Sequence, residues 1–466
     1  MKKPLLVFFL AIVSVIGSVW ILKSNGFYVI DECAHYLYSR FVLQALPVTV
    51  QTWHRPIPQW LFALPAQLGH SFTMFFALSL LICLLLVTYR IAKLKGIRHA
   101  EWVVILVGLQ PVLFDVSYAC MTELPAAFLI TLSYLYYLKE KHGWSLAVAS
   151  AVILCRSEMY IFAGLMFFVY VWKREWKILP LVLLGPLIWI GSTTIISGDV
   201  MTFFREWSKF SSLSKFIPGV SVTHYVENLH TTFGFAQVAF FVAGIVFIAR
   251  AKRSADFGIL YGTIAITLIV HTFAGAEIFH WTGSIGELRY IAVVGPFFGI
   301  VSVYGLSEIL DRVKQPGVHL VFSILVLSVV VFNCILTTHP RRWPNYDQVV
   351  ITLTKALRTE YPNLTLLSNS YVAAYVMDVA PTGGPHFARF NKKTLEEYPE
   401  CLILWDPFSS NSIFSQTELT KKKILQDTTI KVLEKYNYWS AEYFVLYRNK
   451  QGGDSSIVCM PSESQR

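Results

Sequence analysis

The stretch FTMFFALSLLICLLLVTYRIAKLKGIR, residues 72–98, decides the fold class of this 466-residue chain. Its first part is apolar over a length that crosses a bilayer as a helix, which takes about 20 residues. Its second part carries Arg90, Lys93, Lys95 and Arg98 in quick succession. An apolar run followed by a basic loop is typical of a transmembrane helix that ends on the cytoplasmic side.

The composition of the whole chain agrees with that stretch. Hydrophobic residues make up 55% of the chain and charged residues only 15%, against roughly 25% charged residues in soluble domains. These values exclude a disordered chain, a coiled coil and a single soluble core, and seven cysteines do not define a disulfide scaffold. The net charge of +10 resides in loops between apolar runs, so we expect no nucleic-acid partner.

Apolar runs recur along the chain and predict an α-helical, polytopic membrane protein with about 11 transmembrane helices. The runs begin near Leu5, Phe72, Trp102, Leu124, Trp144, Met159, Ile178, Phe235, Phe257, Tyr290 and Val318. Basic residues gather in alternate gaps, which indicates a cytoplasmic N-terminus and a C-terminus on the opposite side. The first run resembles a signal peptide but has no small-residue cleavage site, so we interpret it as an uncleaved anchor.

The last part of the chain predicts a separate, soluble domain. We expect a transmembrane domain over 1–336 and a small extracytoplasmic α/β domain over 337–466. The short apolar runs Leu364–Leu367, Cys401–Trp405 and Tyr443–Tyr447 predict strands, and Tyr346–Thr359 and Leu419–Lys435 predict helices.

Polar motifs gather in the gaps that lack basic clusters. Asp31 and Glu32 follow the first run, and in a helix Asp31 and His35 would share one face while Glu32 points about 100° away. Either the two carboxylates serve chemistry, or they stabilise a helix N-terminus. Arg55, beside Trp53, either binds an anionic head group or extends along the interface.

Further polar residues interrupt later apolar runs. Glu123 precedes Pro125 and either belongs to a site or starts a helix. Arg156 and Glu158 indicate an ion pair at the membrane boundary, although two residues so near in sequence do not face each other on one helix. Arg289 begins a span, where its guanidinium suits a phosphate. His280 and Glu287 lie just before it.

Five motifs in this order resemble the GT-C superfamily of membrane glycosyltransferases, most closely the polyprenyl-phosphate-mannose-dependent mannosyltransferases. The motifs are Asp31-Glu32, Thr52-Trp53 with Arg55-Pro56, Thr122 to Pro125, Arg156 to Glu158, and Glu287 to Tyr290, and the resemblance covers roughly residues 5–336. Two departures stand out. Gly286 replaces a common His or Lys, and His54 stands where the mannosyltransferases have a Glu soon after Thr-Trp.

The resemblance implies transfer of a hexose, with mannose favoured, from a polyprenyl-phosphate sugar to a hydroxyl of a glycolipid, glycan or protein, with inversion. It assigns Asp31 as the catalytic base, Glu32 as its companion acid, and Arg289 as the arginine near the donor phosphate. Together with the polar motifs, it makes the substrate-binding candidates His35, Arg55, Glu123, Arg156, His280, Glu287 and Arg289.

Several alternatives stay open on the sequence. No cofactor is certain, and His35, His54, His280, Asp115 and Glu123 are candidate ligands for a divalent metal without diagnostic spacing. The competing functions are a transporter or flippase of lipid-linked saccharides and a non-catalytic assembly protein. We expect the chain in a bacterial plasma membrane with an extracytoplasmic site, or in the endoplasmic reticulum of a eukaryote.

Overall fold

The computed structural model describes residues 3–51, 53–213, 220–275, 286–410, 424–438 and 441–449. The chain divides into two compact units. The first unit comprises Met1–Ser24 and Leu46–Arg341, and the second comprises Asn25–Ala45 and Arg342–Arg466. The second unit thus includes residues 25–45, which our sequence-based division placed with the transmembrane domain.

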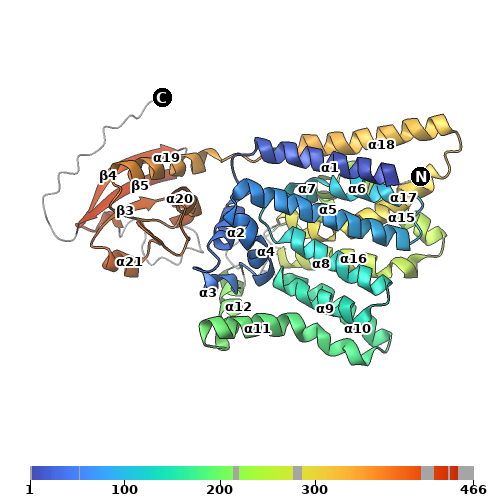
Figure 1. The fold of residues 1–466 in the computed structure, drawn as a ribbon, viewed down its shortest axis with the longest axis horizontal. Coiled ribbons are helices and arrows are strands. Elements are labelled where there is room, and N and C mark those ends of the chain that lie inside the picture. Colours follow the sequence, from blue (N-terminus) through green and yellow to red (C-terminus); the bar gives the residue numbers. More distant parts are fainter. Residues whose placement is uncertain are drawn as a thin grey trace. The chain divides into compact units, whose positions relative to one another are not determined.

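The first unit is helical throughout its described part, and its long helices run side by side (Figure 1). Its α-helices are α1 (Lys3–Lys23), α3 (Leu46–Thr49), α4 (Pro56–Gln67), α5 (His70–Leu94), α6 (Val103–Gly108), α7 (Pro111–Val116), α8 (Glu123–Leu138), α9 (His142–Ala151), α10 (Tyr160–Trp172), α11 (Leu184–Ser197), α12 (Met201–Leu213), α13 (His224–Glu227), α14 (Leu229–Phe233), α15 (Phe235–Arg250), α16 (Gly258–Gly275), α17 (Gly295–Leu310) and α18 (Pro316–Thr337). Short 3₁₀ helices extend several of them, among them η1 (Ala100–Trp102), η2 (Val152–Leu154), η3 (Ser157–Met159), η4 (Trp176–Leu183), η6 (Ser254–Phe257) and η7 (Leu288–Val294).

All eleven predicted apolar runs fall on helical segments. Six stretches of the described chain are long and apolar enough to span a membrane, namely Pro4–Lys23, His70–Leu94, Trp176–Ser197, Ser254–Phe273, Leu288–Leu310 and Pro316–Thr337. Four shorter apolar helices accompany them: Glu123–Leu138, His142–Leu154, Ser157–Trp172 and Phe235–Arg250. The prediction of a polytopic helical membrane protein is confirmed.

The run that begins at Trp102 is a broken helix. Gln110 adopts an extended backbone before Pro111, because proline lacks an N–H and disfavours a helical conformation in the residue before it. Side-chain amides bond to neighbouring carbonyls: Gln237 Nε2 donates to Leu109 O at 3.4 Å and Gln110 Nε2 to Gly295 O at 2.9 Å. An interrupted helix is tolerated at membrane depth only when protein surrounds it, and Leu109 and Gln110 are fully buried.

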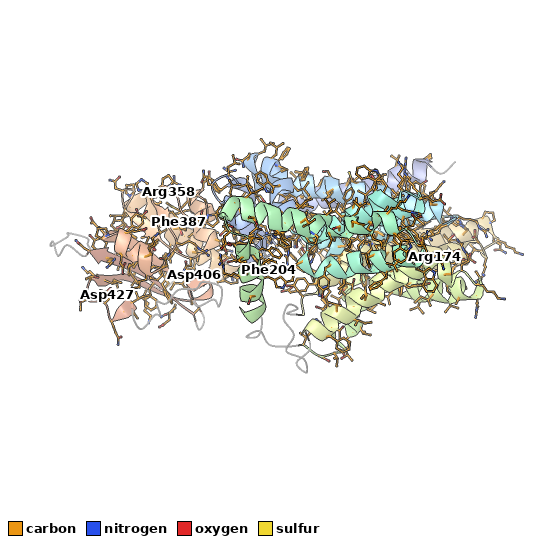
Figure 2. All side chains as sticks on the ribbon, turned by 90° about the horizontal axis from the view of Figure 1, so that it is seen from below. Arg174, Phe204, Arg358, Phe387, Asp406 and Asp427 are labelled. Carbon is orange, nitrogen blue, oxygen red and sulfur yellow. The ribbon has the colours of Figure 1, made fainter. Side chains whose placement is uncertain are left out.

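Helix α17 lies at the centre of the first unit, with almost every side chain buried. Its contact with α15 requires glycine, since a Cβ on Gly305 would lie 2.1 Å from the Phe240 carbonyl oxygen. Small residues of this kind let transmembrane helices approach closely. Helix α12 runs across the end of α11 rather than along it (Figures 1 and 2), and Phe204 on it is 48% exposed.

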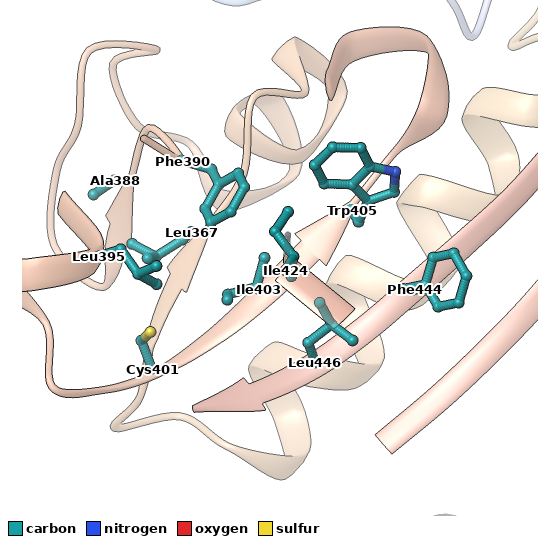
Figure 3. Packing of buried hydrophobic residues seen from close by; sticks show 10 residues of the cluster. All are labelled: Leu367, Ala388, Phe390, Leu395, Cys401, Ile403, Trp405, Ile424, Phe444 and Leu446. Carbon is teal, nitrogen blue, oxygen red and sulfur yellow. The ribbon is translucent and has the colours of Figure 1, made fainter. Parts of the chain in front are cut away.

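The second unit is a small α/β domain, as predicted, in which one five-stranded sheet has the order β2-β1-β3-β5-β4. Strands β1 (Thr365–Leu367), β2 (Phe387–Ala388) and β3 (Glu400–Trp405) are parallel, and β5 (Ala441–Asn449) is antiparallel to both β3 and β4 (Ile430–Tyr438). Helices α2 (Ile30–Arg40), α19 (Asn345–Glu360), α20 (Tyr371–Met377), α21 (Lys392–Glu397) and α22 (Pro407–Ser410) complete the unit. Its hydrophobic core includes Leu367, Trp405 and Phe444 (Figure 3).

Four of the five elements predicted in this unit are confirmed, and the fifth is wrong over part of its length. Residues 430–435 of the expected helix Leu419–Lys435 belong to strand β4, whose register pairs Val432 with Leu446 of β5. Pairing with the apolar strand β5 supplies hydrogen bonds that an isolated helix lacks, so tertiary context overrides the helix propensity of Lys and Glu. Residues 419–423 lie outside the described part.

Candidate functional site

A buried cluster of charged side chains in the first unit centres on Arg156. Its Nη1 lies 2.5 Å from Glu123 Oε1, its Nε donates to Glu158 Oε1 at 2.6 Å, and Nη1 also contacts Thr122 Oγ1 at 3.3 Å. The side chains of Arg156 and Glu123 are 3% and 1% exposed. Charge-assisted bonds of this length are strong, so they fix the guanidinium between two carboxylates.

Local backbone geometry explains why Arg156 reaches Glu158. The sequence predicts an ion pair here, but two residues so close in sequence do not face each other when both belong to one helix. Arg156 instead has an extended backbone, with φ −148° and ψ 114°, and the 3₁₀ helix η3 starts only at Ser157. The two residues do not share one helix, and the predicted ion pair forms through this break between η2 and η3.

Arg289 enters the same cluster from the start of η7. Its Nε lies 3.7 Å from Glu123 Oε1 and 3.9 Å from Glu287 Oε2. The Arg289 side chain is 4% exposed, whereas Glu287 is 40% exposed. Three of the predicted site residues therefore lie together: Glu123, and from a distant part of the sequence Glu287 and Arg289.

Aromatic rings line the cluster. The Tyr290 ring lies under two guanidinium groups, with Arg156 Cζ 4.6 Å and Arg289 Cζ 5.7 Å from its centroid. His271 of α16 lies beside Tyr290, with 5.6 Å between the two ring centroids. His271 is 2% exposed, and its Nε2 has no hydrogen-bond partner in the structure as described. No sequence motif singled out His271, because one histidine in an apolar run has the pattern of an ordinary core residue.

Arg55 approaches from the segment before α4. Its Nη2 lies 3.7 Å from Glu158 Oε2, and its Nη1 donates to Trp53 O at 3.3 Å. The backbone φ of +63° is unusual for a residue other than glycine, and such a conformation costs about 1–3 kcal/mol and concentrates at functional sites. Burial lowers the pKa of Arg55, with the neighbouring Arg156 acting in the same direction.

Three arginines and three carboxylates of the described chain meet in this cluster, at unequal burial. The side chains of Arg55, Arg156 and Arg289 are 10%, 3% and 4% exposed, and those of Glu123, Glu158 and Glu287 are 1%, 23% and 40% exposed. A buried charge needs a partner or a bound counter-ion. Within the described residues, this arrangement is suited to an additional anion.

The position before the Glu287-Leu288-Arg289 motif is occupied by glycine for a steric reason. Gly286 has φ +79°, and a Cβ there would lie 2.4 Å from Val220 Cγ1. The His224 Nε2 of α13 is 2.7 Å from the Gly286 carbonyl oxygen. A histidine or lysine at this position would be strained by the positive φ and would collide with Val220, and the motif is instead fixed by its contact with His224.

The predicted acidic pair lies in the second unit, on α2. Residues 30–40 are helical, so Asp31 and His35 share a face as expected. Glu32 is fully buried, and its Oε2 accepts a hydrogen bond from the Tyr28 N–H at 2.5 Å. Glu32 therefore connects α2 to the segment that precedes it, and Asp31 is partly exposed.

An ion pair and aromatic contacts fix α2 within the second unit. Arg40 Nε lies 2.9 Å from Asp378 Oδ1, next to α20. At the other end, the Phe27 ring packs edge-on against Tyr375 and Trp343. Helix α2 is thus part of the α/β domain and not a loose loop.

The remaining candidates divide into two groups. His280 and Thr52 lie outside the described residues. Asp115 binds Arg341, whose Nη1 lies 3.0 Å from its Oδ1, and His54 is buried with its ring against Trp53. The described residues contain no group of three His, Cys, Asp or Glu side chains able to hold a metal ion, so we derive no step through one.

Comparison with solved structures identifies the fold. The chain matches ArnT from Cupriavidus metallidurans in the apo state with a TM-score of 0.62 at 12% identity, covering 95% of this chain and 98% of that one. The same protein bound to undecaprenyl phosphate gives a TM-score of 0.59 at 11% identity, covering 96% and 98%. No protein-family model and no curated protein sequence matches the chain.

Two further structures share the fold. The arabinofuranosyltransferase AftD from Mycobacteria matches with a TM-score of 0.52 at 12% identity, over 94% of this chain and 40% of that one. The Archaeoglobus fulgidus oligosaccharyltransferase, in complex with Zn and sulfate, matches with a TM-score of 0.50 at 13% identity, over 84% and 68%. The chain is an integral membrane protein with the GT-C fold, and the fold that the resemblance implied is confirmed.

Proposed function

We propose that the chain is a glycosyltransferase that moves a hexose, with mannose favoured, from a polyprenyl-phosphate sugar to a hydroxyl of a glycolipid, glycan or protein. The observation that carries the proposal is the arginine cluster, in which the buried side chains of Arg55, Arg156 and Arg289 meet around Glu123 and Glu158. A polyprenyl-phosphate sugar carries one negative charge on its phosphodiester. Its phosphate oxygens can accept charge-assisted hydrogen bonds from guanidinium groups.

The arginines have distinct roles in this proposal. Arg156 is fixed by Glu123 and Glu158 and forms the support of the site. Arg55 and Arg289 make longer ion pairs, each 3.7 Å, with Glu158 and Glu123, and we assign these two arginines to the phosphate. As the sugar–phosphate bond breaks, the leaving phosphate gains negative charge. Buried guanidinium groups stabilise such charge more strongly than water does.

Asp31 supplies the base. Its carboxylate accepts the proton of the acceptor hydroxyl while that oxygen attacks the anomeric carbon, and the polyprenyl phosphate leaves with the electrons of the broken bond. The attack takes place opposite the leaving group, so the configuration inverts. The partial exposure of Asp31 and the engagement of Glu32 with the Tyr28 N–H support Asp31 over Glu32 for this role.

Two features support the remaining parts of the proposal. The buried His271 Nε2 is an available polar atom beside Tyr290, and we assign it to a hydroxyl of the transferred sugar. The alternation of basic loops supports a site on the extracytoplasmic side, in a bacterial plasma membrane or, in a eukaryotic host, the endoplasmic reticulum. ArnT, with which the chain shares its fold, has been solved bound to undecaprenyl phosphate.

Binding of undecaprenyl phosphate to the purified protein tests the phosphate assignment. Arg289→Ala and Arg55→Ala should each weaken binding by about 10-fold or more, since a lost charge-assisted hydrogen bond is worth about 1.5–3 kcal/mol. Arg289→Lys should restore binding only in part, because lysine lacks the planar fork. Arg205→Ala is the matched control, as Arg205 is 64% exposed and pairs with Asp199. Equal affinity in all four variants would remove these arginines from the phosphate site.

A further inference from the structure

Helix α12 follows a membrane span directly and does not continue it. The span Trp176–Ser197 ends at a left-handed Gly198, and α12 begins at Met201. In both views α12 runs across the end of α11 (Figures 1 and 2). A helix that starts three residues after a span, and turns away from the direction of that span, lies at the level of the membrane surface.

The described side chains of α12 divide largely by polarity around the helix. At about 100° per residue, Met201, Phe203, Phe204 and Trp207 occupy one side, with the small Ser208 between Phe204 and Met201. Thr202, Arg205 and Glu206 occupy the opposite side. Amphipathic helices with aromatic residues on the apolar side lie in the interface plane of a bilayer.

Part of the apolar side contacts protein and part does not. Phe203 and Trp207 pack on the buried Trp189 of α11, with ring centroids 5.5 and 6.5 Å apart. Met201 and Phe204, on the adjoining part of the same side, are 52% and 48% exposed. Large apolar side chains exposed beside a membrane span are suited to lipid and not to water.

We propose that α12 is an interfacial helix and that its exposed apolar side contacts the lipid of the leaflet in which α11 ends. Met201 and Phe204 enter the acyl-chain boundary, and Thr202 and Arg205 face water. The inference is independent of the proposed function, because it rests on the position and polarity of α12 alone. Anchoring by aromatic residues at this depth is the usual arrangement in membrane proteins.

The helix also connects the membrane surface to the segment that carries Arg55. Trp189, on which α12 packs, donates from Nε1 to the Val50 carbonyl oxygen at 2.7 Å. The Arg55 N–H in turn donates to the Gln51 carbonyl oxygen at 3.2 Å. Trp189 therefore contacts both α12 and the segment just before Arg55.

Nitroxide labelling in lipid nanodiscs of phosphatidylcholine and phosphatidylglycerol tests the proposal. Single cysteines replace Met201, Thr202, Phe204 and Arg205 in a cysteine-free background, and the label's collisions with oxygen and with a water-soluble nickel chelate are measured. Leu187, 62% exposed on α11 within the span, is the lipid-facing control. We expect the oxygen-to-nickel ratio at 201 and 204 to approach that at 187 and to exceed the ratio at 202 and 205 several-fold.

Three results would overturn the proposal. A ratio at 204 equal to that at 205 would place the whole helix in water. Low accessibility to both reagents at 201 and 204 would show that protein, and not lipid, covers this side. A lipid-like ratio at 205 would show that the helix is embedded all round. The two independent apolar positions guard against one label that perturbs the local fold.

Discussion

Replacing Arg156 should destabilise the buried cluster, because its guanidinium binds two carboxylates, Glu123 and Glu158. Arg156→Met keeps most of the side-chain volume and removes the charge, leaving Glu123, which is 1% exposed, without its 2.5 Å partner. Breaking a buried ion pair by removing one member costs about 3–5 kcal/mol. We expect the free energy of unfolding to fall by that amount.

The assay is unfolding of the purified protein in mixed micelles by titration with a denaturing detergent, with a thiol-reactive dye reporting exposure of the buried cysteines. The second variant, Glu123→Gln with Arg156→Met, removes both charges. Its loss in free energy of unfolding should be about 1–3 kcal/mol smaller than the summed losses of the single variants Arg156→Met and Glu123→Gln, since the effects of contacting residues are not additive.

The control for this prediction is Arg205→Met. Arg205 and Asp199 form an ion pair with side chains 64% and 44% exposed, and exposed pairs contribute about 0–1 kcal/mol. An Arg156→Met variant as stable as Arg205→Met would refute the reasoning that the cluster is desolvated and rigid. So would a double variant whose loss equals the sum of the single losses.

Three more predictions concern catalysis, pH and sugar recognition. Asp31→Asn should lower turnover by about 10²–10⁴-fold with donor binding retained, as general-base catalysis is worth that much; near-normal turnover, with Glu32→Gln inactive, would assign the base to Glu32. Burial beside Asp406 raises the pKa of Asp347 to about 7 from 3.8, so the folded state binds this proton more tightly than the unfolded state. The contribution of Asp347 to stability should therefore be greatest below about pH 4, fall by up to roughly 4 kcal/mol between about pH 4 and 7, and stay constant above pH 7. Thermal unfolding of Asp347→Asn should lose this part of the pH dependence, and an unchanged profile would exclude Asp347 as its source. His271→Phe should raise the donor KM about 2- to 10-fold, the worth of one neutral hydrogen bond. His271→Gln, whose amide nitrogen lies near the position of Nε2, should restore the donor KM. A donor KM equal to that of the wild-type protein in both variants would exclude the sugar contact.

The transmembrane part of the fold was predictable because hydropathy acts locally. A helix that crosses lipid must be apolar along its own length, so each transmembrane run can be recognised from its local sequence. The run at Trp102 shows the limit of this reasoning. Pro111 marks a break, but only the folded chain shows that Gln110 and Gln237 bond to carbonyls near it.

The α/β domain was predictable where a strand is short, apolar and buried, as in Cys401–Trp405. It was not predictable at 430–435, where lysine and glutamate favour a helix by propensity. Strand β4 forms because β5 offers a partner, and that partner is a non-local fact.

The candidate site was predictable in its residue types but not in its contacts. Arg289, Glu123 and Arg156 stand out in the sequence because charged residues beside apolar spans are expensive. Their mutual contacts depend on the extended backbone at Arg156, which no periodicity indicates. His271 gave no signal at all, since only its spatial position beside Tyr290 distinguishes it.

Transfer of sugar is the central claim, and one measurement tests it most directly. The purified chain in lipid nanodiscs is incubated with a panel of radiolabelled polyprenyl-phosphate sugars and a membrane extract that supplies acceptors, and the labelled product is identified. We expect one hexose donor, mannose favoured, to label a glycolipid, glycan or protein with the wild-type chain, and both Asp31→Asn and Arg289→Ala to reduce that label strongly. No transfer from any donor, while the wild-type protein is folded and supplied with acceptors, would contradict the proposed function.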